Sequence, residues 1–208
     1  MVVTVYMPDD HGKHIRRREI LARRATVSVR RRADEAAALA AALRGVDPGA
    51  WACAYVPRQD EPGSTAMLEA LRTAGARVLL PVTGPPGPLS WGEYTGTAEL
   101  RPARYGLLEP VGPVLPPETV GRAELILVPA LAVDRRGVRL GRGAGYYDRT
   151  LVAAAPAARL IAVIRDDELV ERLPEDPHDI RMGWTLTPSG GLRPTSNCHV
   201  AHDPGPRE

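Results

Sequence analysis

The sequence predicts an α/β protein with a mainly parallel β-sheet that helices cover on both sides. Three observations lead to this prediction. Short apolar segments alternate with helical segments along most of the chain. The segment 124–129 (E-L-I-L-V-P) is apolar on both faces, as in a buried parallel strand. In a segment that reads as a helix, Ala36, Leu39, Ala40 and Leu43 recur at the spacing of one buried face.

The order of elements follows from the same patterns. Two helices are expected at the N-terminus, over residues 13–24 and 30–44, and Gly45 and Pro48 end the second. Two further helices are expected over residues 64–74, with Ser64 or Thr65 as the N-cap, and over residues 146–154. Strands are expected over residues 51–56, 77–81, 89–94, 124–129, 159–164 and 182–187. Prolines predict a loop at 84–88 and largely irregular structure over 100–117, and residues 188–208 are expected to form a polar, mobile tail.

The composition is that of a single globular domain. The chain has 208 residues, of which 44% are hydrophobic and 25% charged, and we expect an extension at 1–12, a domain at 13–188 and a tail at 189–208. It has no run of 18 or more apolar residues and no signal-peptide pattern, so we expect a cytoplasmic protein without membrane contact. Two cysteines are too few for a disulfide framework. A net charge of +2 does not by itself imply a polyanionic partner.

Residues 139–148 (R-L-G-R-G-A-G-Y-Y-D) predict a phosphate-binding loop. Glycines at 141, 143 and 145 allow positive φ angles and a close approach of backbone N–H groups to a ligand. A helix beginning near Tyr146 adds unpaired N–H donors and the positive end of its dipole.

The charged residues of this loop fit the same interpretation. Arg139 and Arg142 carry planar groups that bind phosphate oxygens in pairs, and Asp148 can hold a magnesium ion that bridges phosphates. The loop matches neither the Walker A pattern nor the dinucleotide fingerprint G-x-G-x-x-G. The alternative is a structural glycine-rich hairpin with solvated arginines.

Lys13 is a second candidate for phosphate binding. Lysine and arginine together number 27, and Lys13 is the single lysine among them. In a chain that uses arginine so consistently, a retained lysine suggests a place that needs a compact point charge. The alternative is the chance survival of one exposed lysine.

With these motifs in place, the chain from about residue 13 to 188 resembles the 5-formyltetrahydrofolate cyclo-ligases, also called methenyltetrahydrofolate synthetases. The strongest match is V-P-A-L-A-V-D-R-R-G-V-R-L-G-R-G-A-G-Y-Y-D-R at 128–149. Four weaker matches occur in the family's order: K-H-I-R-R-R-E-I-L-A-R-R from Lys13, Y-V-P-R-Q-D-E-P-G-S-T around Glu61, Y-G-L-L-E-P from Tyr105, and H-D-I-R from His178. Two positions depart from the usual pattern: Ala144 replaces a glycine or lysine, and Arg16 replaces a leucine.

The resemblance implies a three-layer α/β/α fold and a reaction. Family members use ATP and magnesium to convert 5-formyltetrahydrofolate into 5,10-methenyltetrahydrofolate, releasing ADP and phosphate. By resemblance, Asp148 and Asp179 are expected to bind Mg²⁺. Arg142 and Tyr146 are the candidate catalytic residues, because the 142–146 stretch is expected to face both ligands. The positions expected to bind ATP are Lys13, Arg17, Arg139, Leu140, Gly141, Arg142, Gly143, Ala144, Gly145, Tyr146 and Tyr147. The positions expected to bind folate are Val56, Glu61, Tyr105, Arg142, Gly143, Ala144, Gly145 and Tyr146.

Several of these residues could instead have a purely structural role. Tyr105 could be a hydrophobic filler, Glu61 could favour the dipole of the helix that follows it, and His178 could be a solvated surface group. Tyr146 and Tyr147 are expected to divide their roles, with one ring packed under the helix and one facing the ligand. The tail residues Cys198, His199 and His202 do not make a convincing tetrahedral metal site.

Two other functions are considered. The basic segment 11–32 could bind nucleic-acid phosphates, but it lacks interleaved aromatic residues, and charged runs are usually solvated helix faces. A relative of the family could bind nucleotide yet act on another substrate or regulate. The expected small-molecule partner is 5-formyltetrahydrofolate, with or without a polyglutamate tail, and a monomer is the default expectation.

Overall fold

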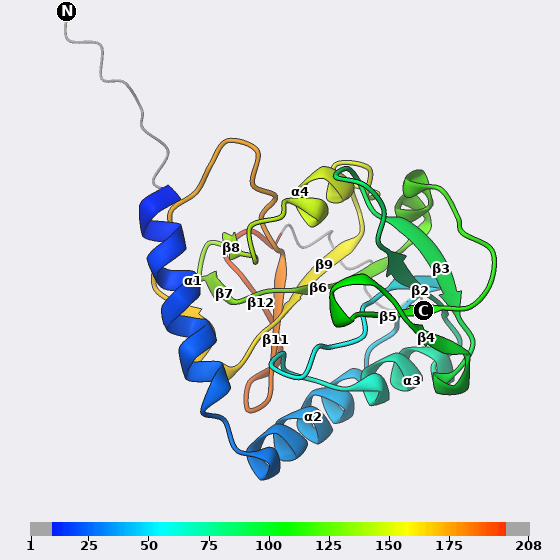
Figure 1. The fold of residues 1–208 in the computed structure, drawn as a ribbon, viewed down its shortest axis with the longest axis horizontal. Coiled ribbons are helices and arrows are strands. Elements are labelled where there is room, and N and C mark those ends of the chain that lie inside the picture. Colours follow the sequence, from blue (N-terminus) through cyan, green and yellow to red (C-terminus); the bar gives the residue numbers. More distant parts are fainter. Residues whose placement is uncertain (1–9, 199–208) are drawn as a thin grey trace, which may run out of the picture.

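The computed structural model describes residues 10–198. Its centre is a seven-stranded sheet in which neighbouring strands follow the order β12-β11-β9-β6-β1-β2-β3 (Figure 1). The strands are β12 (Gly191–Pro194), β11 (Trp184–Thr187), β9 (Arg159–Val163), β6 (Leu125–Pro129), β1 (Trp51–Cys53), β2 (Arg77–Val82) and β3 (Ser90–Tyr94). The four inner pairings, from β11 to β2, are parallel, and the pairings of the edge strands β12 and β3 are antiparallel. The mainly parallel sheet is therefore confirmed.

The helices begin and end close to the predicted positions. They are α1 (Asp10–Ala25), α2 (Val29–Leu43), α3 (Thr65–Thr73) and α4 (Tyr146–Leu151). Ser28 caps α2 by accepting a hydrogen bond from the Arg31 N–H at 3.2 Å, and Ser64 caps α3 by accepting one from the Ala66 N–H at 3.2 Å. Each cap satisfies one of the backbone donors that a helix start leaves unpaired, so these serines fix where the two helices begin.

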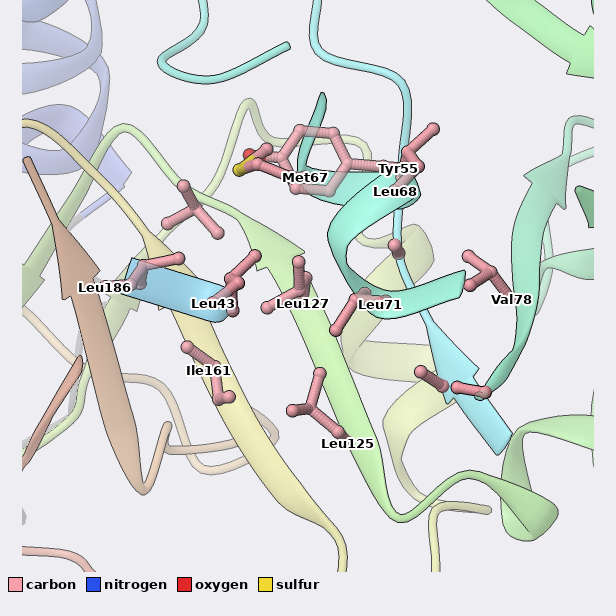
Figure 2. Packing of buried hydrophobic residues seen from close by; sticks show 14 of the residues in the cluster. Leu43, Tyr55, Met67, Leu68, Leu71, Val78, Leu125, Leu127, Ile161 and Leu186 are labelled. Atoms are coloured by element: carbon pink, nitrogen blue, oxygen red, sulfur yellow. The ribbon is translucent and has the colours of Figure 1, made fainter. Parts of the chain in front are cut away.

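Two hydrophobic layers lie on opposite faces of the sheet. On one face, Leu43 of α2 and Leu71 of α3 pack against Leu125 and Leu127 of β6 (Figure 2). The alternate residues of β6 point to the other face, because successive strand residues face opposite sides, and there Ile126 packs in a cluster with Leu151 of α4. Both faces of the sheet are covered, as the apolar pattern of 124–129 predicted.

Helix α1 packs on a smaller sheet rather than on the main one. This sheet has the order β10-β7-β8, with β7 (Ala132–Asp134), β8 (Arg139–Leu140) and β10 (Leu169–Val170). Ile20 of α1 is buried against Leu131, Ala132, Val138 and Leu140, and Figure 1 shows α1 alongside β7 and β8. This small sheet was not predicted from the sequence. It holds α1 next to the glycine-rich loop, which begins where β8 ends.

Several predicted boundaries were wrong. Helix α1 begins at Asp10, inside the expected extension, and α4 ends at Leu151 rather than at 154. The first strand ends at Cys53 rather than at 56. The segment 100–117, expected to be largely irregular, contains a regular feature: β4 (Leu100–Pro102) and β5 (Leu108–Pro110) pair as an antiparallel hairpin. Strands of three residues are specified by their partners rather than by a local pattern, so the sequence did not reveal them.

The expected polar tail contains a strand. Residues of β12 pair with β11 in antiparallel register, from Thr187 with Gly191 to Trp184 with Pro194. The tail is polar because β12 lies at the edge of the sheet, where half of its residues are exposed. Cys198 is the last described residue, and the other two tail residues considered as metal ligands, His199 and His202, lie outside the described range. Within residues 10–198, no helix has the length and apolar character needed to cross a membrane.

Candidate active site

A cavity of about 660 Å³ lies at the carboxyl ends of the parallel strands. Tyr55 and Val56 follow β1, Pro81 and Thr83 mark the end of β2, and Ala130 follows β6. This is the position where ligands bind in open α/β sheets. The volume falls in the usual range for small-molecule sites, about 300–1,000 Å³.

All the predicted site residues line this cavity. Helix α1, the β4–β5 hairpin, the glycine-rich loop and the segment before β11 each contribute a part of its wall. The predicted site residues that line the cavity are Lys13, Arg17, Val56, Glu61, Tyr105, Arg139, Leu140, Gly141, Arg142, Gly143, Ala144, Gly145, Tyr146, Tyr147, Asp148 and Asp179. Residues separated by up to 166 positions in the sequence therefore meet in one site.

The three glycines of the loop serve two different purposes. Gly143 (φ 99°) and Gly145 (φ 68°) adopt the left-handed conformation that glycine allows. Gly141 does not, which corrects the expectation of positive φ at all three. A Cβ atom at Gly141 would lie 2.6 Å from Nη1 of Arg139, so a side chain here would displace the Arg139 guanidinium. Among residues 10–198, no hydrogen-bond partner is found for the backbone N–H of Gly143 or of Gly145.

Charged side chains hold the loop from both sides. Arg17 donates from Nε to the carbonyl oxygen of Gly141 at 3.0 Å. Arg139, only 9% exposed, donates from Nη2 to Asp148 Oδ1 at 2.7 Å. Asp148 is therefore paired with an arginine. Leu140 is fixed by the sheet, because its carbonyl oxygen accepts a hydrogen bond from the Leu131 N–H at 2.8 Å.

Lys13 is a buried charge between two carboxylates. Its Nζ lies 2.7 Å from Oδ2 of Asp176 and 2.7 Å from Oδ2 of Asp179. Burial by itself lowers the pKa of Lys13, but the hydrogen bonds and charges of the two aspartates outweigh it and raise the pKa above its usual value. The ammonium is thus held charged at one end of the cavity, and Lys13 is not an incidental exposed lysine.

The two predicted magnesium ligands have different surroundings. Asp179 lies with Asp176 and His178 in a group whose ligand atoms are all within 4.8 Å of one another. This is the only such group within the described part of the chain, and Asp148 lies outside it. His178 is exposed, in agreement with the solvated alternative, yet it lines the cavity.

Within the glycine-rich loop, Arg142 is held by two neighbouring carboxylates. Its Nε donates to Glu61 Oε1 at 3.2 Å, and its Nη2 donates to Oδ2 of Asp60. Glu61 also accepts a hydrogen bond from the Arg58 N–H at 3.0 Å through Oε2. Burial alone would raise the pKa of Asp60, but the hydrogen bond and charge of Arg142 lower it below its usual value. Arg142 therefore links the glycine-rich loop to the segment after β1.

The aromatic residues differ in exposure. Tyr105 is 69% exposed and is the only non-glycine residue between 10 and 198 with positive φ, at 61°. Tyr146 donates its hydroxyl to the Gly84 carbonyl oxygen at 3.3 Å. The hydroxyl of Tyr147 is buried without a hydrogen-bond partner among the described residues, and burial raises the pKa of Tyr147. The two adjacent tyrosines therefore divide between a buried hydroxyl and one at the surface.

Asp60, Asp176 and Tyr55 contribute to the site and were not predicted from the sequence. Asp60 and Asp176 were overlooked because lone aspartates in polar, proline-containing loops are usually solvated. Their spacing was the available signal. Asp60 directly precedes Glu61, and Asp176 stands three residues before Asp179. The Oδ2 atom of Asp179 accepts a hydrogen bond from the Asp176 N–H at 2.8 Å. Tyr55, which lines the cavity with a buried hydroxyl, read as an ordinary strand residue.

The basic N-terminal segment does not form one cationic face. Lys13 and Arg17 line the cavity, and Arg24 is buried in contact with Glu168. Arg16 and Arg18 are exposed. The charges that made this segment resemble a nucleic-acid-binding stripe are therefore partly internal.

Comparison with known proteins agrees with this geometry. A family model described as the 5-formyltetrahydrofolate cyclo-ligase family matches residues 9–188. The chain is 53% identical over 183 residues to the 5-formyltetrahydrofolate cyclo-ligase of Mycolicibacterium smegmatis, covering 85% of this chain and 93% of the relative. It is 37% identical over 129 residues to that of Escherichia coli K12, covering 59% of this chain and 69% of the relative.

Solved structures agree as well. The NMR structure of 5,10-methenyltetrahydrofolate synthetase from Aquifex aeolicus superposes with a TM-score of 0.72 at 27% identity, covering 88% of this chain and 92% of the other. The 5,10-methenyltetrahydrofolate synthetase of Mycoplasma pneumoniae, at 18% identity and a TM-score of 0.66, shares the fold over 83% and 96% of the two chains. With a family match over most of its length and a relative more than half identical, the chain belongs to the 5-formyltetrahydrofolate cyclo-ligase family.

Proposed function

We propose that the protein converts 5-formyltetrahydrofolate into 5,10-methenyltetrahydrofolate, using ATP and Mg²⁺ and releasing ADP and phosphate. The main support for this proposal is that one cavity combines two chemically different sets of lining residues. A glycine-rich loop flanked by Lys13 and Arg17 suits a polyphosphate, and a segment with Glu61 and Tyr105 suits a flat heterocycle. Family membership supports the same activity.

The nucleotide belongs at the glycine-rich loop. The backbone N–H groups of Gly143 and Gly145, two left-handed residues on either side of Ala144, allow a close approach of phosphate oxygens to the loop. Arg17 lies against the loop, with its guanidinium carbon 3.4 Å from the position that a Cβ of Gly143 would take. A side chain at Gly143 would therefore fill the space between the loop and Arg17. Lys13 adds a compact charge at the same end of the cavity.

The carboxylates around this end fit a hard divalent cation. Asp148, Asp176 and Asp179 offer oxygen atoms, the ligands that Mg²⁺ prefers. Asp148 and Asp179 would hold the ion, which would neutralise charge on the transferred phosphoryl group. Arg139 and Lys13 pair with these carboxylates. They are therefore positioned to balance the acidic charge before a metal–nucleotide complex arrives.

The folate belongs against Val56, Glu61 and Tyr105. Each oxygen of Glu61 accepts one hydrogen bond from the protein. A carboxylate offers about four acceptor positions, so Glu61 retains capacity for N–H donors of a pterin ring. The exposed ring of Tyr105 offers a flat surface for stacking.

The reaction asks the protein mainly for alignment and charge neutralisation. The formyl oxygen bonds to the γ-phosphorus while the bond from that phosphorus to the bridging oxygen of ADP breaks. N10 of the folate then adds to the activated carbon and loses its proton, and the carbon–oxygen bond breaks to release phosphate. Arg142 is bound to Asp60 and Glu61 and belongs to the glycine-rich loop, so it is suited to stabilise charge where the two substrates meet. Tyr146 lines the cavity beside it.

The decisive experiment follows methenyl absorbance after mixing the protein with 5-formyltetrahydrofolate, ATP and Mg²⁺. We expect turnover that stops when EDTA removes the metal or when a non-hydrolysable ATP analogue replaces ATP. Arg142→Met should reduce turnover by more than about 100-fold, and Arg18→Met, on the exposed side of α1, serves as the control. Nucleotide binding by calorimetry without any turnover would instead identify a relative that acts on another substrate or regulates.

A further inference from the structure

A buried network of two arginines and two glutamates lies outside the cavity and contacts two parts of its wall. Arg24 comes from α1, Glu35 from α2, and Arg165 and Glu168 from the segment after β9. Arg24 donates to both oxygens of Glu168 at 2.7 Å, and Arg165 donates from Nε to Glu35 Oε2 at 2.7 Å. All four side chains are less than 10% exposed.

Each arginine also holds a backbone carbonyl at the edge of the cavity. Arg165 donates from Nη1 to the carbonyl oxygen of Asp60 at 3.1 Å. Arg24 donates from Nη2 to the carbonyl oxygen of Ala130 at 2.7 Å. Glu168 joins the two halves, because it binds Arg24 and accepts a hydrogen bond from the Arg165 N–H at 2.8 Å. The network therefore connects the segment after β1 with the segment after β6.

The network is expected to add little to the free energy of unfolding. Moving charges out of water is costly, and buried ion pairs are often replaceable by apolar side chains without loss of stability. Two guanidinium nitrogens, Nη1 of Arg24 and Nη2 of Arg165, are buried with no hydrogen-bond partner among the described residues, which adds to the cost. A charged group retained under these conditions is expected to serve conformational specificity.

We propose that Arg165 is a positioning residue for the folate side of the site, and this inference rests on the proposed function. Arg165 fixes the backbone of Asp60, and Asp60 and Glu61 together hold Arg142. Without the Arg165 hydrogen bond, the turn at 58–61 can shift, and Glu61 and Arg142 move with it. Binding of 5-formyltetrahydrofolate should weaken. ATP binding should be affected less, because Arg142 alone of the loop's charged groups is held by this turn, whereas Lys13 is held by Asp176 and Asp179 and Arg139 by Asp148.

The test compares Arg165→Met with Arg165→Lys and Arg31→Met. Arg165→Met leaves each glutamate one arginine, since Glu35 keeps Arg31 at 2.7 Å and Glu168 keeps Arg24, so the protein is expected to fold. Lysine at 165 retains the positive charge beside Glu35. Its ammonium is a single point charge, so it cannot bind Glu35 and the Asp60 carbonyl oxygen at the same time, as the forked guanidinium of arginine does. Arg31→Met removes the other partner of Glu35 without touching the cavity wall.

For both Arg165 variants we expect the KM for 5-formyltetrahydrofolate to rise roughly tenfold, with the KM for ATP within about twofold of wild type. The backbone amides of residues 58–61 should exchange hydrogen roughly tenfold faster, and Arg31→Met should change neither property. A lowered Tm with unchanged KM and exchange would reduce Arg165 to a purely structural role and overturn the proposal. If Arg165→Met does not fold, the KM values and hydrogen exchange of the Arg165→Lys variant decide whether the proposal holds.

Hydrogen exchange separates this inference from the proposed function. If wild-type protein shows no turnover of 5-formyltetrahydrofolate, the proposed function fails, yet faster exchange at 58–61 in Arg165→Lys would still show that Arg165 positions this turn. If wild type turns over normally and exchange is unchanged in both Arg165 variants, the proposed function stands and the positioning role fails.

Discussion

Two walls of the cavity differ in how firmly they are built. The loop wall consists of Lys13, Arg17 and the segments 139–148 and 176–179. Its charged groups are paired within the protein, with Lys13 between two aspartates and Arg139 on Asp148. The hairpin wall consists of β4, β5 and the turn between them. Tyr105 in the turn and Leu108 at the start of β5 are exposed, and the base of the hairpin is anchored by the Thr83 N–H, which donates to Glu109 Oε1 at 2.8 Å.

This difference matches two different demands of the chemistry. Stabilising a phosphoryl group requires charges held in place before the substrate arrives, because reorganising them would cost part of the catalytic gain. A planar ring can be bound by an aromatic surface that adjusts on contact, since stacking tolerates a range of offsets. The loop wall is therefore expected to be rigid and intolerant of change, and the hairpin wall to be adaptable.

Alanine at two left-handed glycines gives the largest expected contrast. Gly137, in the turn that supports the loop wall, has φ 87°, and a Cβ there would lie 2.1 Å from the Met182 carbonyl oxygen. Gly106, in the hairpin turn, has φ 69° with nothing within 4 Å of its Cβ position. We expect Gly137→Ala to lower the Tm by about 10 °C or more and Gly106→Ala by about 3 °C, measured by calorimetry. Equal losses would mean that the two walls are equally constrained.

Lys13→Ala tests the charge balance of the loop wall. The substitution removes the cation that separates Asp176 from Asp179, and hydrogen bonds of charged groups contribute about 1.5–3 kcal/mol. We expect the KM for ATP to rise by roughly 10–100-fold and the KM for folate to change much less, as measured by steady-state kinetics. Arg16→Ala, on an exposed part of the same helix, is the matched control. Equal increases in both KM values would contradict a phosphate role for Lys13.

Tyr105 tests the hairpin wall with the smallest expected effect. Glycine at 105 removes the ring and relieves the positive φ, whereas Tyr105→Phe retains the ring. We expect Tyr105→Gly to raise the KM for folate about tenfold, from lost stacking of about 0.5–1.5 kcal/mol, while the Tm stays level or rises. Phenylalanine should behave nearly as wild type. If both variants bind folate normally, Tyr105 is a surface residue and the hairpin does not belong to the site.

The fold could be predicted wherever one segment alone carries its pattern. The run at 124–129 is apolar on both faces, and α2 repeats alanine and leucine at helical spacing, so both were found. The strands β7, β8 and β10 span two or three residues each and exist because distant segments pair. Sequence reasoning that proceeds one segment at a time has no access to such pairings.

The same limit applies to the site. The loop at 139–148 and the lone Lys13 could be singled out, because glycine spacing and an unusual residue choice are local signals. Their partners could not, since Asp176 acquires its role only when α1 brings Lys13 to it across 163 positions. The buried position of Arg24 was equally hidden, because in the sequence it is one arginine in a basic run.

The strand β12 has a consequence for the protein's behaviour in concentrated solution. An open sheet edge invites pairing with another chain, and β11 carries a buried apolar residue, Leu186, that would otherwise stand at such an edge. β12 covers β11 and itself ends at Pro194, which has no N–H to offer to an incoming strand. The segment that looks dispensable in the sequence therefore protects the sheet against aggregation, and a chain cut after Thr187 should be prone to precipitate even with its cavity intact.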